Sequence, residues 1–413
     1  MKASNVITVL DIGSTKICCC IANISSHDRV SILGAGYCAC FGVKSGVIID
    51  MESVGKSIVK AIEMAEKAAK ISVKSVYVSV SGRNVKSKIV SASANIGGRI
   101  IKNEDIMNIL SFRDYEDEST EVIHAIPIMY SIDSLGCIKD PLGMMANTLT
   151  VSINFMSVSK IQLNNLLLCI SKCHLEPIGV IASSYACGLY CAEDENDIPI
   201  SQMVIDFGGE TTSLAFIYNG VFCGSEIISI GGKHITRDIA YCLNISTSSA
   251  ERLKTLHGAA FVSIEDERDT VLAPVLEDDN VIDMQQIPKS TLNRIIQPRA
   301  EEILLSIKRK IEESVFKNDF KNSFVIITGG GSQLTSIGDL AAEMLNKNVR
   351  LKKINNTYGE SSLQLGNDFS VALGMIKFVH LNEDLFGKNK LFAEKNDNVG
   401  FLRKTLIWIE NNL

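Results

Sequence analysis

The sequence lacks the features that mark several classes of protein. None of its apolar runs reaches the roughly 18 residues that a membrane-spanning helix needs. None of its 12 cysteines forms a Cys-x-x-Cys pair, and Cys18, Cys19 and Cys20 are consecutive in a strand-like run. The first strand-like segment, 6–10, begins so close to Met1 that we expect no secretory signal. We therefore expect buried, reduced thiols rather than disulfides or a zinc site.

Charge and composition narrow the choice further. The net charge of −6 argues against a nucleic-acid-binding protein. The chain has 413 residues, of which 46% are hydrophobic and 21% are charged, as in ordinary globular proteins. This length is sufficient for two large lobes, each with a buried core.

The two halves of the chain share a pattern of elements. Strand-like segments at 6–10 and 203–207 each run into a turn that contains an Asp followed by Gly. Further strand-like segments follow each turn, and apolar residues at helical spacing come after them at 52–70 and 234–243. This weak duplication predicts an α/β protein with two related lobes.

The two Asp turns are the strongest chemical signal in the sequence. Such a turn offers backbone N–H groups and hydroxyls to a phosphate, while its carboxylate can hold a hydrated Mg²⁺. Each turn alone is also a common structural turn, but two of them could hold a polyphosphate from both sides. The candidate contacts are Asp11, Gly13, Ser14, Thr15 and Lys16 in the first turn, and Asp206, Gly208, Gly209, Glu210, Thr211 and Thr212 in the second.

A third turn, rich in glycine, follows the buried strand-like segment 324–328 and consists of Gly329, Gly330, Gly331 and Ser332. The order of Asp turn, Asp turn and Gly turn resembles the actin, Hsp70 and sugar-kinase superfamily. That resemblance implies that two lobes close on ATP and Mg²⁺. It makes the first two turns the phosphate-1 and phosphate-2 motifs and the third turn the adenosine motif.

The same resemblance assigns two more sets of contacts. Asp11 and Asp206 would hold Mg²⁺, mainly through water. Glu251, Arg252 and Lys254 match the stretch that contacts the adenosine, although an exposed, charged helix face explains them equally well.

Within the superfamily, the whole chain resembles the bacterial cell-division protein family FtsA. The segment 42–52 looks like the family's G-x-x-x-G-x-I-x-D-x-E stretch, and 76–82 looks like the strand before its inserted subdomain. Shorter matches lie within the insert at 124–127 and 139–144, between the lobes at 182–186, and after the adenosine-contact stretch at 257–258. One departure is Glu210, which stands where the family usually has a third Gly. Its carboxylate would repel a phosphate unless Mg²⁺ or Lys16 compensates, or unless it faces water.

The resemblance predicts a two-lobed actin/Hsp70-like ATPase fold with an inserted α+β subdomain. We expect the lobe 1 core (1A) at 1–82 and 158–190, the insert (1C, SHS2-like) at 83–157, the lobe 2 core (2A) at 191–232 and 318–384, the lobe 2 small subdomain (2B) at 233–317, a flexible linker at 385–398 and an amphipathic helix at 399–413.

The final segment, 399–413, places its apolar side chains within about half of the circumference of a helix. Arg403 and Lys404 supply its positive charge, and the only Trp of the chain lies here, as expected at a lipid interface. A terminal helix that docks on the protein body is the alternative. The predicted lipid contacts are Phe401, Leu402, Arg403, Lys404, Leu406, Trp408, Ile409 and Leu413.

The resemblance implies a protein that polymerises with ATP and anchors the FtsZ ring to the cytoplasmic face of the inner membrane at the septum. It implies that the FtsZ C-terminal peptide docks on 233–317 and that other divisome proteins bind through 1C. ATP hydrolysis would be weak at most, and no catalytic residue is identified. The alternatives are a PilM-like pilus adaptor, whose family lacks the tail, a sugar or acid kinase, and an Hsp70-type chaperone, for which the chain is too short.

Overall fold

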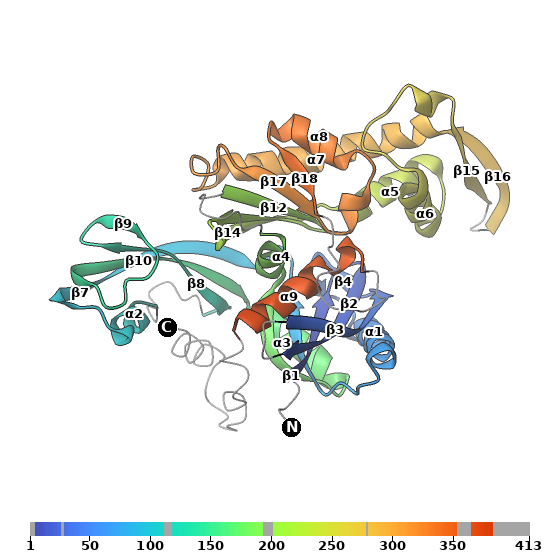
Figure 1. Cartoon of the computed structure of the whole chain (residues 1–413). Helices are drawn as coiled ribbons and strands as arrows, with labels where there is room; N and C mark the ends of the chain where they lie inside the picture. Colours follow the sequence, from blue (N-terminus) through green and yellow to red (C-terminus); the bar gives the residue numbers. More distant parts are fainter. Residues whose placement is uncertain are drawn as a thin grey trace.

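The computed structural model describes residues 5–25, 29–110, 118–192, 201–277, 280–352 and 365–382. The predicted linker and amphipathic tail, 385–413, lie outside these residues. Two lobes, each built on a five-stranded sheet, lie beside each other, and a smaller sheet projects from one end (Figure 1). No helix in the described ranges is long and apolar enough to cross a membrane.

The sheet of lobe 1 has the strand order β11-β6-β1-β2-β3. β1, β2 and β3 are antiparallel neighbours, whereas β6 and β11 run parallel to β1. All three consecutive cysteines are fully buried in β2, and burial raises the pKa of the Cys19 thiol to about 12, so it stays protonated. The strands are β1 (Asn5–Ile12), β2 (Lys16–Ser25), β3 (Arg29–Ala39), β6 (Ser75–Val80) and β11 (Glu176–Ala182).

Helix α1 (Met51–Ala69) covers the outer face of this sheet beside α3 (Lys160–Lys172). The Asp50 carboxylate caps α1 by accepting hydrogen bonds from the N–H groups of Glu52 and Ser53. Val54, Ile58 and Ile62 form its buried stripe, as their spacing predicts. Between α1 and β3, the short hairpin of β4 (Val43–Lys44) and β5 (Val47–Ile48) reaches toward lobe 2.

The sheet of lobe 2 repeats this arrangement with the order β14-β13-β12-β17-β18. Asn219 and Gly220 both have positive φ and form the two-residue hairpin turn between β13 and β14, as an Asn-Gly pair favours. Helices α5, α7 and α8 pack on its outer face around Phe207 and Phe216. The elements are β12 (Ser201–Phe207), β13 (Thr212–Tyr218), β14 (Val221–Ile228), β17 (Phe324–Thr328), β18 (Val349–Leu351), α5 (Gly232–Leu243), α7 (Lys289–Glu313) and α8 (Ile337–Leu345).

Two helices lie between the two sheets (Figure 1). α4 (Ser183–Cys191) packs on β12, β13 and β14, and α9 (Ser370–Leu381) packs on β1 and β2. The helices touch so closely that a Cβ on Gly374 would lie 1.9 Å from the Ala186 carbonyl oxygen. α9, which falls in the segment 318–384 predicted for lobe 2, shares one core with buried residues of both sheets, such as Val9 of lobe 1 and Ile326 of lobe 2. α9 is buried on nearly all sides, so its sequence has no polar face that would show which sheet it covers.

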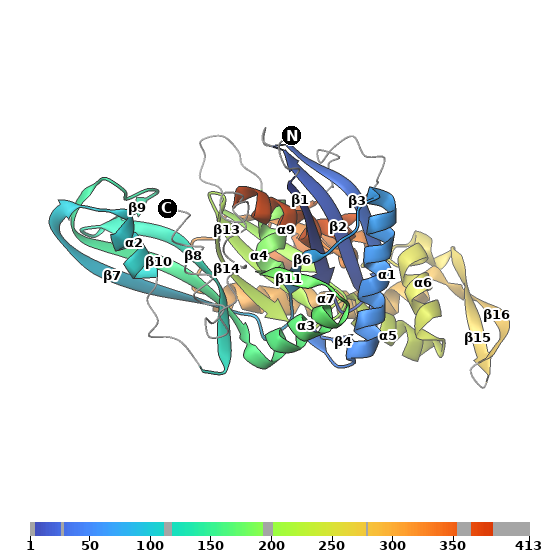
Figure 2. The same cartoon turned by 90° about the horizontal axis from the view of Figure 1, so that it is seen from below.

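The insert is a separate four-stranded sheet with the order β7-β10-β8-β9 and its own core around Ile106, Leu149 and Ile153. It lies at the opposite end of the molecule from the hairpin of β15 (Thr270–Glu277) and β16 (Asn280–Pro288) (Figures 1 and 2). The predicted α+β insert is thus present. Its elements are β7 (Lys86–Ile100), α2 (Asn103–Leu110), β8 (Thr120–Ile132), β9 (Leu135–Ile138) and β10 (Met145–Ser159).

Buried polar groups join the insert to both lobes. His124 Nε2 on β8 accepts a hydrogen bond from the Ala182 N–H at 3.0 Å, and its ring packs edge-on against Tyr185. Burial lowers the pKa of His124 to about 3, so the imidazole is neutral. On the lobe 2 side, Ser87 Oγ accepts a hydrogen bond from the Ser225 N–H at 3.1 Å. The insert is therefore fixed where the two lobes meet.

The small subdomain of lobe 2 combines α5 and α7 with α6 (Thr247–His257), the short 3₁₀ helix η1 (Glu265–Glu267) and the hairpin of β15 (Thr270–Glu277) and β16 (Asn280–Pro288). A pocket of about 250 Å³ lies between the end of α6, the start of β15 and the start of α7. It is lined by His257, Asp269 and Lys289, among others.

Candidate functional site

The fold brings the two Asp turns into contact, although they are 195 residues apart in the sequence. The first turn follows β1 of lobe 1 and the second follows β12 of lobe 2. A Cβ on Gly209 would lie 2.3 Å from Thr15 Cγ2, so only glycine allows the turns to approach this closely. The first turn is closed by a hydrogen bond of 3.0 Å from the Gly13 N–H to the Lys16 carbonyl oxygen.

The two aspartates share a weakly solvated environment. Asp11 is buried and accepts a hydrogen bond of 2.6 Å from Ser79 Oγ. Burial raises its pKa, against the effects of this hydrogen bond and of Lys16. Burial and the negative charge of Asp11 raise the pKa of Asp206 to about 6. Two carboxylates that oppose each other's ionisation are stabilised by a divalent cation, and carboxylate oxygens are ligands that Mg²⁺ accepts.

Lys16 makes an ion pair with the Asp368 carboxylate. Asp368 belongs to the 3₁₀ helix η3 (Asn367–Phe369), which leads into α9. The sequence analysis missed Asp368, because its segment follows no strand and carries no Gly-rich or Asp-turn pattern. Only the fold shows that Asp368, 352 positions after Lys16 in the sequence, contacts the first turn.

The Gly-rich turn lies against the second Asp turn. Gly329 has a φ of +82°, and a Cβ there would lie 2.2 Å from Asp206 Oδ1. A Cβ on Gly331 would lie 2.1 Å from the Phe207 ring. The Ser332 hydroxyl donates to the Gly329 carbonyl oxygen at 2.7 Å and so shapes the turn. Gly330 and Ser332 belong to the 3₁₀ helix η2 (Gly330–Gln333), so the third predicted motif adjoins the other two.

Backbone hydrogen bonds from the start of α5 hold the second turn in place. The N–H groups of Gly232 and Lys233 donate to the carbonyl oxygens of Gly208 and Gly209 at 2.9 and 2.8 Å. Of the two threonines, Thr211 is half-buried, whereas Thr212 is buried and donates its hydroxyl to the Ile230 carbonyl oxygen at 2.8 Å.

The residues predicted on α6 form a second layer behind α5. Lys254 Nζ donates to the Gly232 carbonyl oxygen at 3.1 Å and pairs with Glu251 at 2.7 Å. Glu251 also accepts a hydrogen bond from the Thr236 hydroxyl. Arg252 is exposed. Glu251 and Lys254 are therefore anchored next to the second turn, whereas no described contact ties Arg252 to it.

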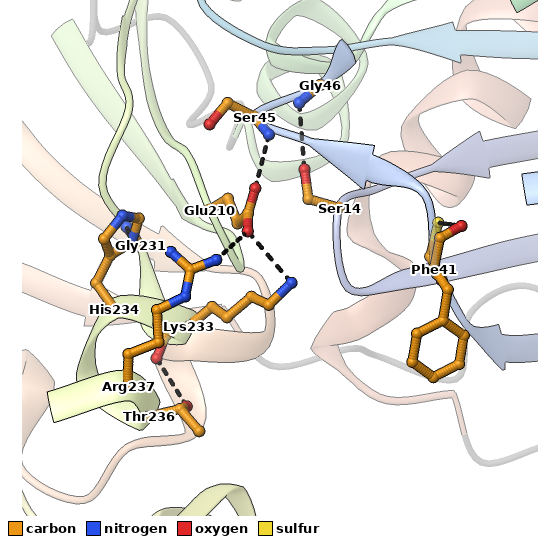
Figure 3. Close-up of polar contacts among 12 residues, drawn as sticks. Ser14, Phe41, Ser45, Gly46, Glu210, Gly231, Lys233, His234, Thr236 and Arg237 are labelled. Carbon is orange, nitrogen blue, oxygen red and sulfur yellow. Dashed lines mark hydrogen bonds and ion pairs between the residues drawn. The ribbon is translucent and has the colours of Figure 1, made fainter. Parts of the chain in front are cut away.

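Glu210 is part of a cross-lobe contact (Figure 3). Its side chain is only 2% exposed and accepts a hydrogen bond of 2.7 Å from the Ser45 N–H in the β4–β5 hairpin of lobe 1. Its other oxygen lies 2.7 Å from Arg237 Nη2 and 3.2 Å from Lys233 Nζ on α5. Burial alone would raise the pKa of Glu210, but the Ser45 N–H, Lys233 and Arg237 lower it overall. The carboxylate is thus ionised and compensated by groups other than Mg²⁺ or Lys16.

The residues present fit a nucleotide phosphate and a magnesium ion. The turns combine glycines that exclude side chains, backbone N–H groups, the cation of Lys16 and two neighbouring carboxylates. Among the described residues, no three acidic, His or Cys side chains gather as direct metal ligands. A cation at Asp11 and Asp206 would therefore keep most of its ligands as water and phosphate oxygens.

Comparison with known proteins agrees with this geometry. The family model "Cell division protein FtsA" matches residues 203–374, and the model "SHS2 domain inserted in FTSA" matches residues 82–157. The cell division protein FtsA of Rhizobium meliloti is 31% identical over 387 residues, covering 91% of this chain and 87% of the relative. The FtsA of Escherichia coli K12 is 27% identical, with 90% of both chains covered.

Solved structures share the fold at lower identity. A PilM–PilN type IV pilus biogenesis complex matches with a TM-score of 0.64 and 16% identity, covering 91% of this chain and 98% of that chain. MreB5 of Spiroplasma citri bound to ADP matches with a TM-score of 0.56 and 13% identity, covering 93% and 98%. These likenesses establish an actin-like ATPase fold with an SHS2 insert. From its two matched family models and its identity to curated relatives, the chain belongs to the FtsA family of cell division proteins.

Proposed function

We propose that this protein binds ATP with Mg²⁺ between its lobes, polymerises, and ties the FtsZ ring to the cytoplasmic face of the inner membrane at the division septum. The observation that carries the nucleotide part is the contact between the turns of the two lobes, in which Gly209 meets Thr15 beside Asp11 and Asp206. A ligand that binds both turns would join the lobes. Family membership supports the role in cell division.

The phosphate contacts that we propose are the backbone N–H groups and hydroxyls of the two turns, together with Lys16. Asp11 and Asp206 would hold Mg²⁺ mainly through water. The Gly329–Ser332 turn, with Glu251 and Lys254 behind α5, would bind the nucleoside. We keep Arg252 as a weaker candidate, because it is exposed and none of its described contacts reaches the turns.

We propose two attachment regions away from the nucleotide. The FtsZ C-terminal peptide would dock on 233–317, where the 250 Å³ pocket of the small subdomain offers a recess that includes His257 and Lys289. Other divisome proteins would bind the SHS2 insert, which projects from the end of the molecule (Figure 2). The tail, 399–413, would bind lipid weakly as a single helix, and a filament with many tails would bind far more tightly.

The membrane role is tested by flotation of the full chain with lipid vesicles and ATP. Trp408→Glu should leave the protein in the soluble fraction, because it places a charge on the apolar face of the tail. Tyr241→Glu is a matched control, since it adds the same charge at a residue that is 89% exposed on α5. Equal flotation of wild type and Trp408→Glu would contradict the proposed anchor.

A PilM-like pilus adaptor is the second candidate, because the PilM–PilN structure matches the fold over most of both chains. Adding purified FtsZ to the same flotation assay discriminates between the two. Recruitment of FtsZ to the vesicles by this protein supports the cell-division role, and flotation of the protein without FtsZ favours the adaptor.

A further inference from the structure

We propose that Asp368 competes with the phosphates of the nucleotide for Lys16 and thereby weakens ATP binding. This inference rests on the proposed nucleotide site and adds to it a residue that sets its affinity. Lys16 is the cation of the first turn, and Asp368 forms an ion pair with it from the segment that precedes α9.

The position of Asp368 is fixed by its neighbours in sequence. Asn367 Nδ2 donates to Ser332 Oγ at 3.0 Å, which ties η3 to the Gly-rich turn. Ser370 Oγ lies 2.6 Å from Thr328 Oγ1 at the end of β17, and it donates to the Asn367 carbonyl oxygen at 2.8 Å. These contacts hold the backbone on both sides of Asp368, so its carboxylate is presented to Lys16 by a braced segment.

The carboxylate also lies close to the Gly-rich turn. A Cβ on Gly330 would be 2.9 Å from Asp368 Oδ1 and 3.7 Å from Lys16 Nζ. The ion pair therefore occupies the space where the first turn of lobe 1 meets the Gly-rich turn of lobe 2. A phosphate bound between these turns would compete with the Asp368 carboxylate for the positive charge and the N–H donors of Lys16 Nζ.

The charges around Lys16 make this competition unfavourable for an anion. Asp11, Asp368 and Lys16 all act electrostatically on the Asp206 carboxyl group, and of these three charges only that of Lys16 is positive. The Lys16 side chain is 25% exposed and that of Asp368 is 40% exposed, so solvent screens the pair only in part. Asp368→Asn would remove the negative charge with little change in shape and would free Lys16 for the phosphate.

If Asp368 only held Lys16 in place, Asp368→Asn would change the affinity for ATP in the opposite direction. In that case the substitution would leave Lys16 disordered and would weaken nucleotide binding. The direction of the change in ATP affinity therefore distinguishes competition from a purely structural role of Asp368.

The test is equilibrium binding of ATP, with excess Mg²⁺, to the full chain by titration calorimetry, with adenosine as a second ligand. Asp368→Asn should bind ATP about fivefold more tightly, as expected for release of a partly exposed ion pair. Its affinity for adenosine should not change. Asp339→Asn is the control, because it removes the same charge from an exposed position on α8 of lobe 2.

The same substitution in a Lys16→Met protein tests whether the gain in ATP affinity depends on Lys16. In Lys16→Met, the gain from Asp368→Asn should be clearly smaller, because no lysine is released. An equal gain in both backgrounds would indicate simple charge repulsion and would overturn the competition, as would unchanged or weaker ATP binding by Asp368→Asn. Failure of the wild type to bind ATP at all would instead refute the proposed nucleotide site itself.

Discussion

Asp206→Ala should reduce the affinity for ATP·Mg²⁺ by about 10- to 100-fold, the range for loss of a group that acts on a metal through its outer shell. Asp206 ends β12 and lies against Gly329, where the second turn meets the Gly-rich turn. No other described carboxylate of lobe 2 belongs to these turns apart from Glu210, which is engaged by Ser45, Lys233 and Arg237. Titration calorimetry with ATP and Mg²⁺ measures the effect.

Asp206→Asn is the control for this experiment, and the pKa of Asp206 determines how stable this variant should be. Its folded-state value of about 6 lies above the ordinary value of 3.8, so the folded protein binds this proton more tightly than the unfolded chain does. The stability that the group contributes is therefore complete below pH 3.8 and is lost as the pH rises through 6. Asp206→Asn, which cannot ionise, should be more stable than wild type at pH 8 while binding ATP·Mg²⁺ more weakly than wild type.

The same pKa predicts a pH dependence of binding. Below pH 6 the Asp206 carboxyl group is protonated and cannot hold the cation, so the affinity of wild type for ATP·Mg²⁺ should fall between pH 7 and pH 5. Protonation of ATP itself affects wild type and Asp206→Asn alike, so the steeper fall of wild type isolates the residue. Equal pH slopes in the two proteins would argue that the second turn is only structural.

Glu210→Gln should loosen the contact between the lobes and lower the free energy of unfolding by about 2 kcal/mol, the cost of weakening hydrogen bonds to charged groups at a buried acceptor. The wild-type carboxylate joins the Ser45 N–H of lobe 1 to Lys233 and Arg237 of lobe 2 (Figure 3). Because the two cations are partly exposed, water compensates for some of the loss.

Amide hydrogen exchange measures the loss of the cross-lobe contact at one backbone N–H group, that of Ser45. The Ser45 N–H should exchange roughly tenfold faster in Glu210→Gln, because the hydrogen bond to the carboxylate protects it. The neighbouring Gly46 N–H is the internal control, since it donates to Ser14 Oγ at 3.2 Å within lobe 1. Acceleration at both amides would point to general unfolding of the hairpin, and no acceleration at Ser45 would contradict the cross-lobe clamp.

The sequence was sufficient to predict the two-lobed architecture and to single out the turns that meet between the lobes. Strand–Asp–Gly turns in both halves predicted two lobes that face each other, and the contact of Gly209 with Thr15 agrees with this. The inserted α+β subdomain that the family resemblance predicted is present as a separate sheet with its own core.

Other features depend on tertiary contacts that have no local signal. α9 is apolar on nearly every side, so its sequence could not show that it packs between the two sheets, against β1 on one side and α4 on the other. Asp368 and Lys16 are distant in the sequence and belong to no shared motif. The partners of Glu210 come from a hairpin of the other lobe and from α5, so the compensation of its charge was visible only in the structure.

The most direct measurement is electron microscopy of the full chain on lipid vesicles, with and without ATP and Mg²⁺. We expect membrane-bound filaments of wild type with ATP and Mg²⁺, and none with Asp206→Ala under the same conditions. Filaments that form equally well without nucleotide, or with Asp206→Ala, would contradict the claim that ATP·Mg²⁺ between the lobes controls assembly.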